Sequence, residues 1–196
     1  MRYFIRPGFQ DILHKIFLLR IHETRIIKRF LKLINRKNKS IKVLDVGCGS
    51  GFYYNILSNL SSNIFYFGFD RSKLMVKVSK KKHPNGYFFV CKASSFNSRK
   101  KFDVILLIGI LEFNPLDYEK IIINLFRYLK KPGVMVITIT KKSFIGFLYF
   151  LYHRLVNQTS IRLFSFRETK KIFQKICDGK IKILNSFLCK IVIIER

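Results

Sequence analysis

The chain has 196 residues, 49% of them hydrophobic, which indicates a single domain with a sizeable core and argues against a disordered chain. Lys and Arg number 38 against 11 Asp and Glu, a net charge of +27 that favours anionic partners: nucleic acid, an acidic membrane surface or acidic metabolites. An AT-rich genome would also enrich Lys, Ile, Asn and Phe and exclude Trp, so the charge has two open explanations, one functional and one compositional.

The four cysteines lie far apart and form no CxxC pair, which argues against a zinc ribbon or a dense disulfide framework. Free thiols in a reducing compartment, the cytoplasm, fit best. The basic N-terminus lacks the apolar stretch of a signal peptide. The apolar run 144–152 is far shorter than the roughly 20 residues of a spanning helix. We therefore expect a soluble protein with no transmembrane segment and at most a weak peripheral membrane contact.

Hydrophobic periodicity predicts the elements in chain order. Apolar residues at three- and four-residue spacing predict one or two amphipathic helices over residues 9–35. Short apolar runs predict strands at 41–46, 63–69, 87–91, 102–108, 134–140, 181–184 and 191–194. Helices are expected from Phe52, after the capping residue Ser72, over 117–129 and from the capping box at 165–168.

Strands that alternate with helices predict an α/β fold with a doubly wound, mainly parallel sheet. Only a few residues join the last two predicted strands, so these should form an antiparallel hairpin at one edge. We expect one domain over 1–196, made of an N-terminal helical cap (1–38), a core (41–140), an insertion (141–164) and a C-terminal helix and hairpin (165–196).

The most informative segment is VLDVGCGSGF, residues 43–52, in which a strand ends, three glycines alternate and a helix begins. Glycines at such a turn let the backbone approach a ligand closely. Asp70 ends the next strand, where its carboxylate can accept hydrogen bonds from both ribose hydroxyls of a nucleoside. The alternative is a purely structural role, with a tight turn between strand and helix and an Asp that caps the following helix.

The glycine spacing and one acidic residue indicate which nucleotide binds. The pattern is GxGxG rather than the dinucleotide fingerprint GxGxxG, and no P-loop sequence is present. Asp45 lies just before the loop and would repel a pyrophosphate. A ligand with a cationic end, such as the amino group and sulfonium of S-adenosylmethionine, suits this carboxylate better.

At these residues the chain resembles the class I S-adenosylmethionine-dependent methyltransferases of small-molecule type. VLDVGCGSG matches that family's first motif, FYFGFDRSKLMV the second, and FDVILLIGILEF and LKKPGVMVITIT the fourth and fifth strand segments. The resemblance implies a Rossmann-like, seven-stranded sheet with an antiparallel last strand. It also implies S-adenosylmethionine as cofactor, no metal, and cofactor contacts from Asp45, Gly47, Cys48, Gly49, Gly51, Asp70, Arg71, Ala93, Ser94 and Ile108.

Two departures weaken the assignment of the remaining site residues. Lys92 stands where relatives have an acidic residue near the adenine, and Phe113 stands where many have a histidine. The catalytic residue is therefore unknown. Tyr53, Phe113 and His153 are candidates for contact with the substrate, although Tyr53 could equally pack in the core, and the four scattered histidines are expected at the surface or an interface.

The aromatic insertion 141–161 and the N-terminal helices should shape an apolar pocket with a basic rim, unless these aromatic residues complete the core. The favoured function is methyl transfer to a small molecule by a monomer or homodimer, with no specific nucleic-acid partner. The alternatives are an RNA methyltransferase that uses the basic surface and a non-catalytic cofactor-binding subunit.

Overall fold

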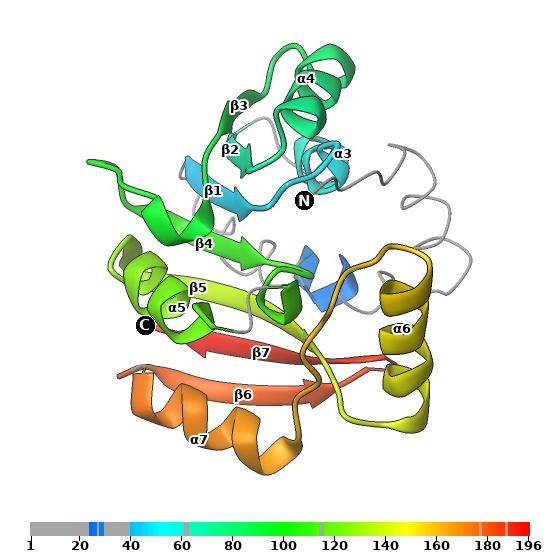
Figure 1. Ribbon diagram of the computed structural model, residues 1–196. Coiled ribbons are helices and arrows are strands. Elements are labelled where there is room, and N and C mark those ends of the chain that lie inside the picture. The colour runs from blue at the N-terminus through cyan, green and yellow to red at the C-terminus, as the bar shows by residue number, and fades with distance from the viewer. Residues whose placement is uncertain are drawn as a thin grey trace.

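The computed structural model describes residues 24–26, 28–29, 40–60, 63–113, 116–176, 178–186 and 188–196 (Figure 1). Its sheet has seven strands in the order β3-β2-β1-β4-β5-β7-β6. The strands are β1 (Ile41–Val46), β2 (Ile64–Asp70), β3 (Tyr87–Val90), β4 (Phe102–Leu107), β5 (Leu129–Thr140), β6 (Lys180–Asn185) and β7 (Cys189–Glu195). The helices are α3 (Phe52–Ser58), α4 (Lys73–Lys82), α5 (Tyr118–Phe126), α6 (Phe144–Leu155) and α7 (Phe166–Ile176), with short 3-10 turns η1 (Ala93–Ser95) and η2 (Leu111–Phe113).

The sheet confirms the expected doubly wound, mainly parallel topology. Strands β1 to β5 pair in parallel, whereas β7 runs antiparallel to both β5 and β6. The chain leaves β1 toward β2 and β3, then returns to β4 on the other side of β1. The strand order thus reverses between β1 and β4, and in such sheets ligands bind beside this point, at the carboxyl ends of the strands.

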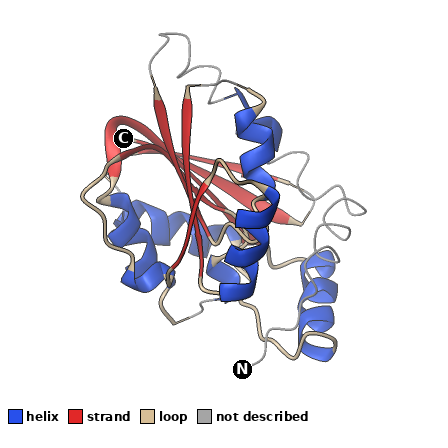
Figure 2. Cartoon of the chain, turned by 90° about the horizontal axis from the view of Figure 1, so that it is seen from above, coloured by secondary structure: helices blue, strands red, loops and turns tan. Residues whose placement is uncertain are grey.

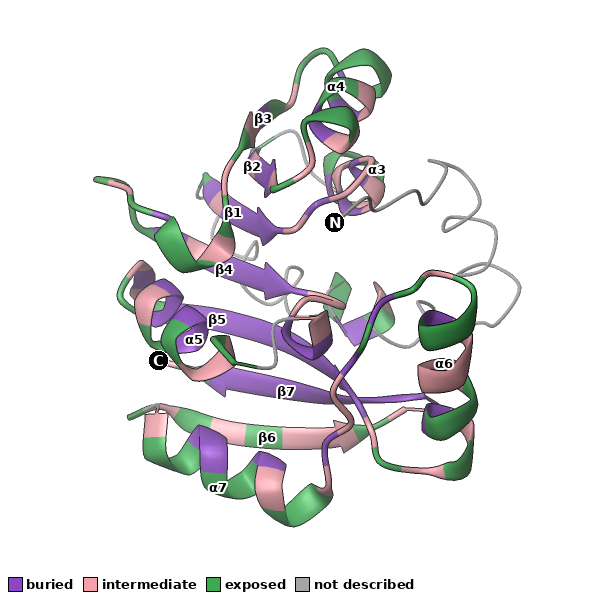
Figure 3. Cartoon of the chain, viewed as in Figure 1, coloured by how far each residue is buried: buried purple, intermediate pink, exposed green. Residues whose placement is uncertain are grey.

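Two hydrophobic clusters cover the two faces of the sheet, with helices on both sides (Figure 2). Alternate residues of β1 serve different clusters: Leu44 and Val46 face the cluster of α5 and α7, while Ile41 and Val43 face that of α3 and α4. The central strands are buried on both faces (Figure 3), as a parallel sheet between two helical layers requires.

Two predicted helix starts have the expected hydrogen bonds. Ser72 Oγ accepts a bond from Met75 N–H at the start of α4. At the start of α7, Glu168 N–H donates to Ser165 Oγ while Ser165 N–H donates to the Glu168 carboxylate. This reciprocal pair is the capping box that the sequence predicts.

The boundary between α5 and β5 differs from the prediction. Leu129 is the first residue of β5 and pairs with Phe102, instead of lying on the preceding helix. The register then shifts, so that Val104 pairs with Val134. This irregularity places Pro132 and Gly133 within the strand, although both residues were predicted to precede it.

The predicted N-terminal helices (9–35) lie almost wholly outside the described residues, of which 24–26 and 28–29 are helical. The insertion 141–164 contains a helix, α6, that the sequence analysis did not assign. None of the helices in the described ranges is both long and apolar enough to cross a membrane.

Candidate active site

The glycine loop of residues 47–51 follows β1 directly and leads into α3 at the point where the strand order reverses. Cys48 N–H donates to the Phe69 carbonyl, 2.9 Å away, which ties the loop to the end of β2. Gly51 N–H donates to the Cys48 carbonyl and closes the turn. All three glycines have positive φ, at +67° for Gly47, +55° for Gly49 and +84° for Gly51, a conformation that other residues rarely adopt.

The three glycines serve different purposes. A Cβ at Gly47 would meet the Ile110 side chain, and one at Gly51 would meet the His83 ring. These two glycines therefore allow close packing within the protein. Within the described part of the chain, a Cβ at Gly49 would meet no atom within 4 Å. Gly49 thus presents an open side, as a loop against which a ligand lies should do.

Asp70, the last residue of β2, links this loop to the start of α4. Its Oδ2 accepts a hydrogen bond from Gly49 N–H at 3.1 Å, and its Oδ1 accepts one from Ser72 N–H at 2.8 Å. Burial raises the pKa of Asp70, while the Ser72 and Gly49 N–H groups and the charge of Arg71 act against that shift. The Arg71 N–H also lowers this pKa by hydrogen bonding. A carboxylate offers about four acceptor positions, so Asp70 can still accept from a ligand hydroxyl.

Asp45 lies beneath the loop and is buried. Its Oδ2 accepts a hydrogen bond from the Tyr66 hydroxyl of β2. Burial, followed by the Asp45 charge, raises the pKa of Tyr66, so the phenol stays protonated and donates. The pKa of the Cys48 thiol is raised by burial and by the charges of Asp45 and Asp70, so Cys48 is not a nucleophile. The loop therefore sits in an electronegative environment.

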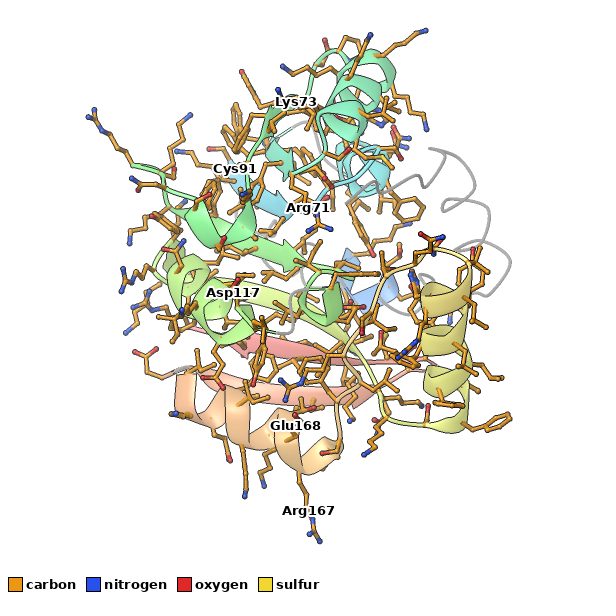
Figure 4. The ribbon with its side chains drawn as sticks, in the orientation of Figure 1. Arg71, Lys73, Cys91, Asp117, Arg167 and Glu168 are labelled. Carbon is orange, nitrogen blue, oxygen red and sulfur yellow. The ribbon has the colours of Figure 1, made fainter. Side chains whose placement is uncertain are left out.

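The residues expected to contact the rest of a nucleoside occupy neighbouring loops. Arg71 is exposed on the loop after Asp70 (Figure 4). Ala93 is half-buried and Ser94 is exposed, both in η1 after β3, and Ile108 is half-buried after β4. The fold brings these positions to the same edge of the sheet as Gly49.

A cluster of rings lies where η2 meets α6. The ring centroids of Phe113 and His153 are 5.1 Å apart, and those of Tyr149 and His153 are 4.5 Å apart. His153 Nδ1 lies 3.1 Å from Asn157 Nδ2 and 3.3 Å from Thr159 Oγ1. Burial lowers the pKa of His153 to about 4, so its imidazole is neutral at physiological pH. The sequence analysis named Phe113 and His153 separately, and the structure brings them into contact.

Sequence reasoning missed Glu112, which neighbours this ring cluster. The buried Glu112 Oε1 accepts a hydrogen bond from Thr140 Oγ1 at 3.1 Å, and its carbonyl accepts one from Arg162 N–H at 2.8 Å. Glu112 therefore joins the ends of β4 and β5 to the segment before α7. Its position after a buried strand was the only sequence signal.

Two expectations about the histidines were wrong. His83 and His153 are both buried rather than at the surface. The His83 ring packs against Tyr54, 4.8 Å between centroids, and lies under Gly51. Burial lowers the pKa of His83, which keeps the ring neutral and makes an interior position tolerable. His14 and His22 lie outside the described residues.

Tyr53 is buried in the cluster that α3 and α4 share, which is the core role that the sequence left open for it. Cys48, Cys91 and Cys189 carry free thiols. Within the described ranges, no group of three or more His, Cys, Asp or Glu side chains could hold a metal ion. The site is thus built from backbone N–H groups, two carboxylates and a set of rings.

The chain is similar in sequence to known methyltransferases. The ubiquinone biosynthesis O-methyltransferase of Pelagibacter ubique is 31% identical over 145 residues, which cover 70% of this chain and 59% of that protein. The demethylmenaquinone methyltransferase of Thermotoga maritima is 28% identical, with coverage of 72% and 63%. The chain thus spans about three fifths of the length of these relatives.

Solved structures agree in fold. Magnesium protoporphyrin IX methyltransferase from Synechocystis PCC 6803, with bound SAH, superposes with a TM-score of 0.67 at 15% identity, covering 89% of this chain and 82% of that one. The plantazolicin methyltransferase BpumL gives 0.69 at 18% identity, covering 90% and 84%. A family model described as a methyltransferase domain matches residues 37–177. With its glycine loop, its Asp70 and its seven-stranded sheet, the chain belongs to the class I methyltransferase family.

Proposed function

We propose that the chain binds S-adenosylmethionine and transfers its methyl group to a small, largely apolar aromatic acceptor. The observation that carries this proposal is the pairing of Asp70 with Gly49. One N–H of the glycine loop holds the carboxylate, while the loop keeps an open side above Gly49. The structures with bound SAH that share this fold support the choice of cofactor.

The residues present fit this cofactor. The remaining acceptor capacity of Asp70 suits ribose hydroxyls, and the open side of Gly49 leaves room beside them. The buried negative charge of Asp45 favours the cationic methionine end at this loop. Ala93, Ser94 and Ile108 would line the adenine, with Arg71 at the rim.

When bound, the cofactor supplies an electrophilic methyl carbon on a positively charged sulfur. The part of the protein is to hold an acceptor in line with that carbon, because alignment alone lowers such a barrier greatly. Phe113, Tyr149 and His153 form an aromatic wall for the acceptor. We assign no general base. His153 Nδ1 contacts both the Asn157 amide and the Thr159 hydroxyl, which fix the orientation of the ring.

The relatives support the acceptor class. Two of them are named as a ubiquinone biosynthesis O-methyltransferase and a demethylmenaquinone methyltransferase, and a quinone is a ring compound. The aromatic wall of this chain is compatible with a similar ring. The chain covers only part of those relatives, so the acceptor is proposed from the wall and the relatives' names together.

The alternatives receive no support from the relatives. An RNA methyltransferase would gather its basic residues around the cofactor site. Here exposed lysines lie on α4 and on α7, which cover opposite faces of the sheet. We propose only weak, salt-sensitive polyanion binding, and a monomer or homodimer in a reducing compartment such as the cytoplasm, where free thiols persist.

Isothermal titration calorimetry with S-adenosylmethionine and SAH tests cofactor binding first. Label transfer from methyl-tritiated S-adenosylmethionine to short-chain hydroxylated quinols then tests the acceptor, with bulk tRNA as the competing substrate. We expect label in the quinol fraction, and none with Asp70→Ala. Label in a particular structured RNA at physiological salt would reverse the assignment of the acceptor.

A further inference from the structure

Helix α6 has two unlike faces, and among the described residues only one of them is buried against the rest of the fold. The inner face carries Gly146, Tyr149 and His153, which are buried or half-buried, and Figure 3 shows buried and exposed residues alternating along the helix. A Cβ at Gly146 would meet the Lys141 carbonyl, so the helix packs closely at its start. This face joins α6 to the aromatic wall of the candidate site.

The outer face is an apolar stripe with helical spacing. Its members recur every three or four residues, so they lie along one side of the helix. We name the outer stripe as Phe144, Phe147, Leu148, Leu151 and Leu155. Four of these five are among the exposed large hydrophobic residues of the protein, and Leu151 is half-buried. Such a continuous exposed apolar surface marks an interaction site.

The charges around this stripe indicate what covers it. Over residues 141–156, which include α6, the sequence has three basic residues and no acidic one. Lys142 and Arg154 are exposed just before the helix and in its last turn. An apolar helix face with basic residues at its rim is the pattern by which helices lie on anionic lipid surfaces.

We propose that α6 docks the protein on an anionic phospholipid surface, with the outer stripe in the lipid interface and Lys142 and Arg154 against the headgroups. Docking would bring Phe113 and His153, which lie behind the helix, close to the membrane surface from which an apolar acceptor would enter. This last consequence rests on the proposed function, whereas the docking itself does not.

The absence of tryptophan from the chain provides a direct test. Phe147, on the outer stripe, and Phe65, at the start of β2, are nearly equally exposed, at 49% and 47%. The variants Phe147→Trp and Phe65→Trp each carry a single tryptophan, whose emission can be excited selectively. We add vesicles of phosphatidylcholine alone, or with phosphatidylglycerol. The proposal expects a blue shift and quenching by brominated lipid for F147W with phosphatidylglycerol vesicles, and neither change for F65W.

A second matched pair separates docking by α6 from attraction by the overall charge. Leu148 on α6 and Leu74 on α4 are 49% and 54% exposed. Because burying a leucine contributes a large part of such binding, Leu148→Glu should weaken co-sedimentation with phosphatidylglycerol vesicles at least about tenfold. Leu74→Glu, which adds the same charge, should change it less than about twofold.

Each other outcome overturns the proposal. Equal losses in both glutamate variants would mean that net charge alone attracts the vesicles. Equal shifts in F147W and F65W would mean that the outer stripe is not the docking surface. Equal binding to vesicles of phosphatidylcholine alone would mean that the surface does not select anionic lipid. A wild-type dimer that Leu148→Glu dissociates, measured by light scattering, would assign the stripe to a second copy. Calorimetry with S-adenosylmethionine in the absence of vesicles reports separately on the proposed function.

Discussion

Replacing Asp70 by alanine tests the assignment of the cofactor site most directly. The carboxylate holds the loop through Gly49 N–H at 3.1 Å and the start of α4 through Ser72 N–H at 2.8 Å. Its remaining acceptor capacity would serve the ribose hydroxyls. A hydrogen bond to a charged group contributes about 1.5–3 kcal/mol, so the loss of one such bond weakens binding about tenfold or more. The variant would lose its hydrogen bonds to the two ribose hydroxyls, but water would partly replace the carboxylate. We therefore expect Asp70→Ala to weaken cofactor binding about 10- to 100-fold.

The assay is calorimetry with S-adenosylmethionine and SAH, with circular dichroism to confirm the fold. Asp103 provides a matched control, because it also accepts a backbone N–H, that of Lys42 at 2.8 Å, and sits beside Lys130 at the opposite end of the sheet. Asp103→Ala should leave the affinity unchanged. Unchanged affinity in a folded Asp70→Ala variant would refute the assignment of Asp70 to the ribose.

Three further outcomes are expected. Gly49→Val should fold but abolish cofactor binding, because the side chain fills the open side of the loop at a φ of +55°; normal affinity in calorimetry would make the loop a mere turn. Tyr66→Phe should lower the free energy of unfolding by about 1.5–3 kcal/mol in urea titrations, since a buried hydroxyl no longer donates to the Asp45 carboxylate, and an equal loss for the exposed Tyr87→Phe would contradict this reasoning. The pKa of His153 is about 4 in the folded chain against 6.5 when unfolded. Between these pH values the His153 imidazole is protonated only in the unfolded chain. The free energy of unfolding should therefore fall by roughly 3 kcal/mol as the pH drops from 6.5 to 4. Denaturant midpoints should fall less steeply with pH for His153→Gln.

The sequence predicted those parts of the fold that short-range patterns determine. β1, the glycine loop and Asp70 were all found because alternation, glycine spacing and the end of an apolar run are local signals. The capping box at Ser165 and Glu168 is likewise local, and both of its hydrogen bonds are present. The parallel sheet followed from the alternation of strands and helices, and the antiparallel pairing of β6 with β7 followed from their short connection; the structure confirms both.

Contacts between distant segments could not be predicted. Tyr66 and Asp45 are 21 residues apart, and only the pairing of β1 with β2 brings the hydroxyl to the carboxylate. His83 and His153 were assigned to the surface because the sequence does not show which rings will stack around a neutral imidazole. The early start of β5 was missed for a similar reason, since Leu129 is a strand residue only through its partner Phe102.

The two backbone bonds of Asp70 bear on how quickly a ligand is captured. Hydrogen bonds from Gly49 and Ser72 orient the carboxylate within the protein itself, so the proposed site would be largely pre-formed. A pre-formed site loses little conformational freedom on binding and needs no rearrangement after encounter. The association rate should therefore be set by diffusion and orientation rather than by internal motions of the protein. Selectivity among nucleosides should then appear in the dissociation rate.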